Sequence, residues 1–286
     1  MPTKIFNPLA GKNSPGPRFR FRVRSIAHQS LYLPETMENL PQIRQLIDGV
    51  SPLVVFNCND IKTARHAFYE LRKKYDFPYW AALDYLIPDK NKTSNLVTLH
   101  LNGIQRYLAA VFTMRANAGL HGKYIISKTV PRSGLTTLVQ AYILWLQLYH
   151  HSHHSITCTH SPDMMDTLKT SVARCLHRKG GGNIVFVTDT ANAFFQSVYI
   201  PHYLDGCRSS YVHLADMSKW SVNCGEDSDH IYFNALCGWS GTPASLFVLE
   251  GDYPSPVSFS NPFFLNKLLL SSDPNVPSEF LHIKLP

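Results

Sequence analysis

Residues 123–149 read KYIISKTVPRSGLTTLVQAYILWLQLY, and this stretch decides the fold. It begins as an apolar strand, passes through a short turn with proline, serine and glycine, and continues as a helix that opens on two threonines. A strand, a loop and a helix in this order can cradle phosphate, because backbone N–H groups and the helix N-terminus point at the anion. The stretch therefore predicts a nucleotide site in an α/β protein.

The loop departs from the standard phosphate loop, Gly-x-x-x-x-Gly-Lys-Ser/Thr. Gly134 and the hydroxyl of Thr136 match that pattern, whereas Thr129 replaces the first glycine and Leu135 replaces the lysine. The layout of a phosphate site is thus present without its central charge. An ordinary strand-to-helix connection capped by Thr136 is the alternative. If the loop is a phosphate cradle, we expect Leu135→Lys to raise nucleotide affinity.

The composition is that of a globular protein, because 44% of the 286 residues are hydrophobic and 16% are charged. The net charge of +7 fits a polyanionic partner but is modest for this length. The six cysteines form no Cys-x-x-Cys pair, and the N-terminus lacks the apolar core of a signal peptide. The longest apolar run, residues 138–148, is too short to span a bilayer. We therefore expect an intracellular protein with reduced thiols and no membrane segment.

Strands and helices alternate along the chain. Strands are predicted at 96–101, 123–128, 155–159, 183–188, 211–216 and 245–251, and helices at 59–74, 103–118, 136–149 and 162–177. This order predicts a mostly parallel sheet with helices on both faces and the loop at its carboxyl edge. We expect strand 211–215 to lie beside strand 123–128. We divide the chain into an N-terminal arm with a helical appendage, residues 1–95, and a main α/β domain, residues 96–286.

Residues 18–24, RFRFRVR, alternate arginine with apolar residues. As a strand this segment places four arginines on one face: Arg18, Arg20, Arg22 and Arg24. They are candidates for contacts with nucleic-acid phosphates. The favoured alternative is an edge strand that its arginines keep soluble.

A histidine-rich segment follows the long helix. It contains His150, His151, His153, His154, Cys158 and His160. Histidine and cysteine bind zinc, but these residues lack the paired spacing of zinc sites. A solvated loop is therefore favoured over a metal site.

Several segments, taken in order, resemble one protein family. They are YWA at 79–81, LNGIQR at 101–106, the loop with its strand and helix at 125–150, VHLADMSKW at 212–220 and LCGWSGTPASLFVLEG at 236–251. Their order and spacing resemble the ATPase domain of the large terminases of tailed phages, particularly phages of Bacteroides-like hosts. The resemblance covers about 170 residues. It implies a P-loop NTPase fold of the RecA/ASCE type, with ATP and Mg²⁺ as ligands.

The resemblance also implies roles for individual residues. Gln105 matches a glutamine on the adenine side, and Thr136 matches the hydroxyl that holds Mg²⁺. Asp216 matches the acidic residue that faces the metal and orients the attacking water, and Glu250 begins the coupling motif. Asp216 and Glu250 are therefore the catalytic candidates. The other candidates for nucleotide contact are Lys128, Arg132, Ser133, Gly134, Leu135 and Thr137.

The departures from the family pattern bear on activity. Arg132 or Lys128 would have to replace the missing lysine, and Ala215 removes a second metal-facing group. Loss of one such contact lowers the rate of a reaction by ~10²–10³. We therefore expect weak or undetectable ATP hydrolysis, as in a pseudo-ATPase, and a role as a DNA- or protein-binding module of phage DNA packaging. An active packaging motor that uses Arg132 is the alternative, and an unrelated α/β protein is a third possibility.

The resemblance further implies double-stranded DNA as a partner, in the cytoplasm of a bacterial host cell. Large terminases carry a nuclease domain after the ATPase. Here the carboxylates after Glu250 are Asp252, Asp273 and Glu279, and these do not make a strand-borne acidic triad. We therefore expect no DNA cleavage by this chain. The portal, the small terminase and a separate nuclease are the expected packaging partners.

Overall fold

The structure is a computed structural model of the 286-residue chain. It describes residues 18–22, 31–32, 53–57, 59–89, 95–120, 122–129, 133–150, 154–159, 162–178, 187–188, 193–198, 209–220, 225–242, 245–253, 261–273 and 279–286.

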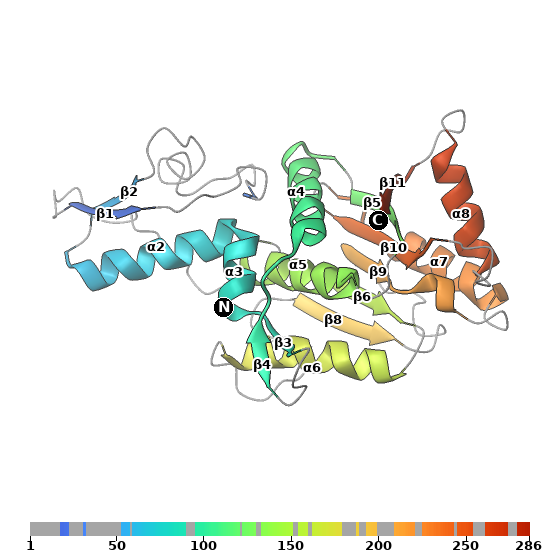
Figure 1. Ribbon diagram of the computed structural model, residues 1–286, viewed down its shortest axis with the longest axis horizontal. Helices are drawn as coiled ribbons and strands as arrows, with labels where there is room; N and C mark the ends of the chain where they lie inside the picture. The colour runs from blue at the N-terminus through green and yellow to red at the C-terminus, as the bar shows by residue number, and fades with distance from the viewer. Residues whose placement is uncertain are drawn as a thin grey trace.

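A mostly parallel sheet forms the centre of the described residues (Figure 1). Its strands, in spatial order, are β11 (Leu281–Leu285), β5 (Gly122–Lys128), β10 (Leu246–Asp252), β9 (Tyr211–Leu214), β6 (Ser155–Cys158), β8 (Ala193–Val198) and β7 (Val187–Thr188). Neighbours from β11 to β8 are parallel, and β7 pairs antiparallel with β8. The predicted α/β class with a mostly parallel sheet is confirmed.

One prediction about strand order is wrong. β9 does not lie beside β5, because β10 separates them and pairs in parallel with both. All three strands are buried on both faces, so hydrophobicity alone does not show which of them are neighbours in the sheet. β6 pairs in parallel with β9 on one side and with β8 on the other. The segment predicted as a strand at 183–188 is described only in part. Residues Val187 and Thr188 of that segment form β7, which pairs antiparallel with β8. Residues 183–186 lie outside the described residues.

Helices cover both faces of the sheet, as predicted. On one face α4 (Gly103–Asn117), α5 (Leu135–Tyr149) and α6 (Pro162–Arg178) share a core with Tyr124, Ile126 and Val248. On the other face α7 (Gly225–Gly238) and α8 (Pro262–Ser272) pack on Phe247 and Leu249. The two cores follow from the two-residue alternation of side chains along β10.

α5 is the most deeply buried helix of the first face. All its residues from Leu138 to Gln147 are buried, which is the pattern of a helix enclosed by other elements. Its two glutamines are buried and hydrogen-bonded to the sheet: Gln147 donates to Ser155 and Gln140 to Thr157. α5 is therefore fixed against β6 along its length.

The N-terminal part contains α2 (Ile61–Tyr75) and α3 (Phe77–Asp84). Asp60 caps α2, since its Oδ1 accepts from the Thr63 N–H at 2.9 Å. β3 (Leu86–Pro88) and β4 (Leu96–Thr98) form a small antiparallel sheet. Phe77 and Trp80 of α3 belong to the same core as α5. The division of the chain at residue 95 stays a prediction.

The arginine segment forms β1 (Arg18–Arg22), which pairs antiparallel with β2 (Leu53–Asn57). This two-stranded sheet is separate from the main sheet and lies at the opposite end of the molecule from α8 (Figure 1). Arg24 lies outside the described residues. In the described part of the chain, no helix is both long enough and apolar enough to cross a bilayer.

Candidate phosphate-binding site

The candidate site lies at the carboxyl edge of the parallel sheet. Lys128 ends β5, Glu250 lies near the end of β10, and Asp216 follows β9. Thr136 is in the first turn of α5. Parallel strands end at the same edge, and the ligands of open α/β sheets bind there. The structure thus brings together four of the residues predicted from the sequence.

Strand alternation explains why these side chains face α5. Ile126 and Val248 belong to the core under α5, and Lys128 and Glu250 lie two residues further along the same strands. Tyr211 and His213 are related in the same way on β9. The face that is apolar in the middle of the sheet therefore becomes polar at its carboxyl end.

Lys128 is buried among carboxylates. Its Nζ lies 2.7 Å from Asp216 Oδ1, 2.8 Å from Glu250 Oε1 and 3.9 Å from Asp252 Oδ1. Only 6% of the residue is exposed. Burial lowers the pKa of Lys128, but the charge of Glu250 and the hydrogen bonds to both carboxylates outweigh it, so the net shift is upward. Lys128 is thus a fixed cation of the site.

Glu250 accepts hydrogen bonds on both oxygens. Lys128 Nζ and Thr136 Oγ1 lie 2.8 and 2.7 Å from Oε1. Thr136 Oγ1 is also 2.9 Å from Oε2, which His213 Nε2 contacts at 2.9 Å. Burial raises the pKa of Glu250, yet the His213 hydrogen bond and the Lys128 charge lower it to about 2. A carboxylate with so low a pKa is a poor proton acceptor near neutral pH, so Glu250 acts as a fixed anion.

A second row of polar residues supports Glu250, and sequence reasoning missed it. His213 Nδ1 lies 2.7 Å from Gln140 Nε2, which also donates to Thr157 Oγ1 at 2.8 Å. Because the amide nitrogen donates to Nδ1, the imidazole proton is on Nε2 and points at Glu250. The side chains of His213, Gln140 and Thr157 are all buried. The available signal was a lone polar residue inside an apolar run, as for Gln140 in α5 and His213 in β9.

The loop enters α5 through Gly134. This residue has φ 75° and provides no side-chain cap, so the first N–H groups of α5 have no capping side chain. Gln105 Nε2 donates to the Gly134 carbonyl at 2.9 Å, and Asn102 Nδ2 donates to the Ser133 carbonyl at 3.3 Å. Gln105 also completes a capping box with Asn102. Gln105 therefore holds the loop in place, and its predicted adenine contact stays a prediction.

The remaining predicted residues are Leu135, Thr137, Arg132 and the arginines of β1. Leu135 is 2% exposed and belongs to the core under α5, so its side chain points away from the charged cluster. Thr137 is half-buried in the first turn of α5. Arg132 lies outside the described residues. The arginines of β1 belong to a separate sheet and are not part of this site.

Metal ligation by side chains alone finds no support among the described residues. They contain no group of three or more His, Cys, Asp or Glu arranged to hold a metal ion. In the histidine-rich segment, the His150 ring packs against Tyr32 and Trp145, with centroid distances of 4.4 and 4.8 Å. His151, His153 and His160 lie outside the described residues.

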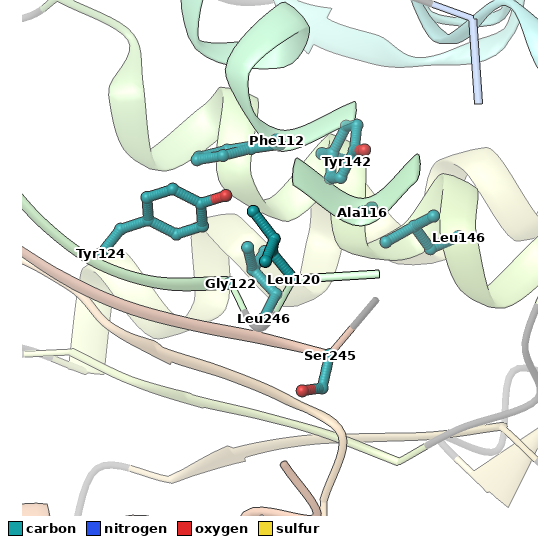
Figure 2. Close-up of a pocket in the computed structure, with 9 residues that line it drawn as sticks. All are labelled: Phe112, Ala116, Leu120, Gly122, Tyr124, Tyr142, Leu146, Ser245 and Leu246. Atoms are coloured by element: carbon teal, nitrogen blue, oxygen red, sulfur yellow. The ribbon is translucent and has the colours of Figure 1, made fainter. Parts of the chain in front are cut away.

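Figure 2 shows a small cavity whose lining contains no residue of the charged cluster. Its wall includes Gly122 and Leu246 at the amino ends of β5 and β10, together with Phe112, Tyr124 and Tyr142. The cavity measures about 10 Å³, which is room for about one water. It is therefore no candidate for a nucleotide site.

The backbone at Gly134 provides a test of the loop geometry. A Cβ there would lie 2.6 Å from Gln105 Nε2, at a positive φ that disfavours side chains. We expect Gly134→Ala to lower the free energy of unfolding by about 1–2 kcal/mol, measured by urea denaturation. Gly103→Ala is the matched control, since a Cβ at this first residue of α4 meets no atom within 4 Å. Equal effects of the two substitutions would contradict the strained geometry of Gly134.

The buried carboxylate makes the protein sensitive to acid. The folded-state pKa of Glu250 is about 2, below its ordinary value of 4.5, so its contribution to stability is present above pH 4.5. We expect this contribution to be lost as the pH falls from 4.5 to about 2, by on the order of 1–3 kcal/mol. Urea denaturation over this range should show a smaller loss in Glu250→Gln. Parallel pH profiles of the two proteins would be inconsistent with a depressed Glu250 pKa.

Comparison with known proteins finds a resemblance in fold only. No protein-family model matches the chain, and no curated protein matches it in sequence. Among solved structures, the large terminase ATPase domain of a Thermus phage, in a mutant form, is similar with a TM-score of 0.42 and 9% sequence identity. The match covers 65% of this chain and 80% of that one. A likeness at this level is distant, and it identifies no residue of the site.

Proposed function

We propose that the chain binds Mg²⁺–ATP at the carboxyl edge of its sheet, hydrolyses it weakly or not at all, and serves phage DNA packaging as a terminase-like binding module. One observation carries the nucleotide part of this proposal: the Lys128 ammonium is buried beside Thr136, Asp216 and Glu250 where α5 begins. Buried, strongly interacting charges at such a position are characteristic of functional sites. The resemblance in sequence motifs carries the packaging part.

The residues present fit a phosphate group. The first N–H groups of α5 lack a side-chain cap, and the helix N-terminus favours an anion. Lys128 reaches the same region from the end of β5 and can supply the charge that Leu135 does not. The Thr136 hydroxyl and the Asp216 carboxylate are oxygen ligands of the kind that Mg²⁺ prefers alongside phosphate oxygens. When bound, Mg²⁺ would neutralise charge on the phosphates.

The same geometry supports slow hydrolysis. Phosphoryl transfer to water needs a group that orients the attacking water. Both oxygens of Glu250 already accept hydrogen bonds, and its low pKa makes it a weak base. Asp216 Oδ1 accepts from Lys128, and the residue before Asp216 is Ala215. Neither catalytic candidate is thus arranged to position water in this structure.

Equilibrium dialysis with ATP, with and without Mg²⁺, tests binding, and a phosphate-release assay tests turnover. We expect saturable, Mg²⁺-dependent binding with little or no turnover. Rapid turnover would favour the alternative of an active packaging motor. Absence of binding at millimolar Mg²⁺–ATP, both to wild type and to Glu250→Gln, would overturn the nucleotide site.

The proposed contact with DNA is electrostatic. The net charge is +7, and β1 carries alternating arginines. We expect binding to duplex DNA that is indifferent to sequence and weakens steeply between low and physiological salt. Replacement of Arg18, Arg20, Arg22 and Arg24 by glutamine should reduce the slope of log affinity against log salt. An affinity that stays constant across this range of salt would argue against phosphate contacts.

A further inference from the structure

Glu250 uses the donors that a phosphate ligand would require. Lys128 Nζ lies 2.8 Å from its Oε1, and the Thr136 hydroxyl lies within 2.9 Å of both its oxygens. These are the two side-chain groups assigned above to the phosphates and their metal. The Glu250 carboxylate is completely buried. Like a phosphate group, it carries negative charge on oxygen atoms that accept hydrogen bonds.

Glu250 is also held in place through Oε2, whereas Lys128 contacts Oε1. His213 Nε2 donates to Oε2 at 2.9 Å, and Gln140 fixes the imidazole through Nδ1. Glu250 therefore keeps one strong hydrogen bond when Lys128 and Thr136 leave it. Such an anchored anion can lose two partners without becoming a buried group that has no partner.

Lys128 likewise has a second partner. Its Nζ contacts Asp216 Oδ1 at 2.7 Å in addition to Glu250, and Asp252 lies 3.9 Å away. Removal of the Glu250 charge therefore leaves the Lys128 ammonium paired with Asp216 alone among its two close anions. The cation is then less completely neutralised and more available to an incoming anion.

We propose that Glu250 is a built-in competitor for the phosphate site, which holds Lys128 and Thr136 in the ligand-free protein and must release them when a phosphate-bearing ligand binds. This inference rests on the proposed function of the site. His213 is the positioning residue that keeps the competing carboxylate in reach. Binding exchanges charge-assisted hydrogen bonds to Glu250 for similar ones to the ligand, so the net affinity is reduced.

Glu250→Gln tests the competition because it keeps the shape of the side chain and removes its charge. The buried neighbours can accommodate the amide. Gln140 Oε1 is buried and has no hydrogen-bond partner among the described residues, so rotation of the Gln140 amide would let His213 carry its proton on Nδ1. His213 Nε2 would then accept from the new amide.

The experiment measures the equilibrium binding of Mg²⁺–ATP and of pyrophosphate to wild type, Glu250→Gln and Glu279→Gln. Glu279 is the matched control, since it pairs with Lys123 at the other end of β5 and its loss changes the net charge equally. We expect Glu250→Gln to bind both probes about tenfold more tightly or better, and Glu279→Gln to bind as wild type does. The shift of the thermal midpoint by pyrophosphate provides a second readout.

The outcomes separate this inference from the proposed function. If wild type binds Mg²⁺–ATP and Glu250→Gln binds it no more tightly, the competition is refuted and the nucleotide site stands. If neither protein binds either probe while both remain folded, the site and the competition are both refuted. An equal gain in Glu279→Gln would show a general charge effect and would also refute the competition.

Discussion

Lys128→Met is expected to lower the free energy of unfolding by about 3–5 kcal/mol, the range seen when one partner of a buried ion pair is removed. The substitution leaves Glu250 and Asp216 buried without the ammonium that lies 2.8 and 2.7 Å from them. Methionine fills a similar volume, so the loss reports the uncompensated charges rather than a cavity. Urea denaturation at neutral pH measures the effect.

Lys123→Met is the control for Lys128→Met. Lys123 is on the same strand and pairs with Glu279, whose side chain is 70% exposed, so its removal should cost less than about 1 kcal/mol. The double variant Lys128→Met with Glu250→Gln should be less destabilised than the sum of its single variants, because it removes opposite charges together. Additive effects, or equal losses at Lys123 and Lys128, would contradict a buried charge cluster.

Leu135→Lys is expected to lower stability by about 2–5 kcal/mol, as for loss of a large apolar core side chain, and to leave nucleotide affinity unimproved. Leu135 is 2% exposed and packs in the core under α5. A lysine at this position would bury its ammonium among apolar side chains or disturb the start of α5. The sequence alone suggested the opposite, a gain in affinity, because it did not show where the side chain points.

Leu135→Met separates packing from charge at this position. Because it conserves volume and apolar character, it should cost less than about 1.5 kcal/mol. Urea denaturation and equilibrium dialysis with Mg²⁺–ATP, applied to both variants, measure stability and affinity. A stable Leu135→Lys protein that binds nucleotide more tightly than wild type would show that residue 135 faces the phosphate loop.

The fold class was predictable, but the order of the strands was not. Alternating apolar strands and amphipathic helices indicated a parallel sheet, and the strands at β5, β6, β9 and β10 were found at the predicted places. Their neighbours depend on long-range packing, and buried strands carry no outward polar face that distinguishes one neighbour from another. For this reason β10 was not expected between β5 and β9. The helix α8 and the edge strand β11 were not predicted.

The sequence predicted the residues of the candidate site better than it predicted their contacts. The resemblance in sequence motifs pointed to Thr136, Asp216 and Glu250, and Lys128 was a candidate to replace the missing lysine. The structure places these residues at strand ends and at a helix start. The sequence could not show that Lys128 crosses the end of β10 to reach Asp216, since that contact depends on strand order. The support from His213 was missed because a histidine within an apolar strand gives no local signal of its partners.

The affinity of two matched proteins for Mg²⁺–ATP tests most directly whether Lys128 is the phosphate-binding cation. Glu250→Gln and the double variant Lys128→Met with Glu250→Gln differ only in Lys128, and equilibrium dialysis gives both dissociation constants. We expect loss of Lys128 to weaken binding about tenfold to hundredfold. Equal affinities in two folded proteins would contradict it.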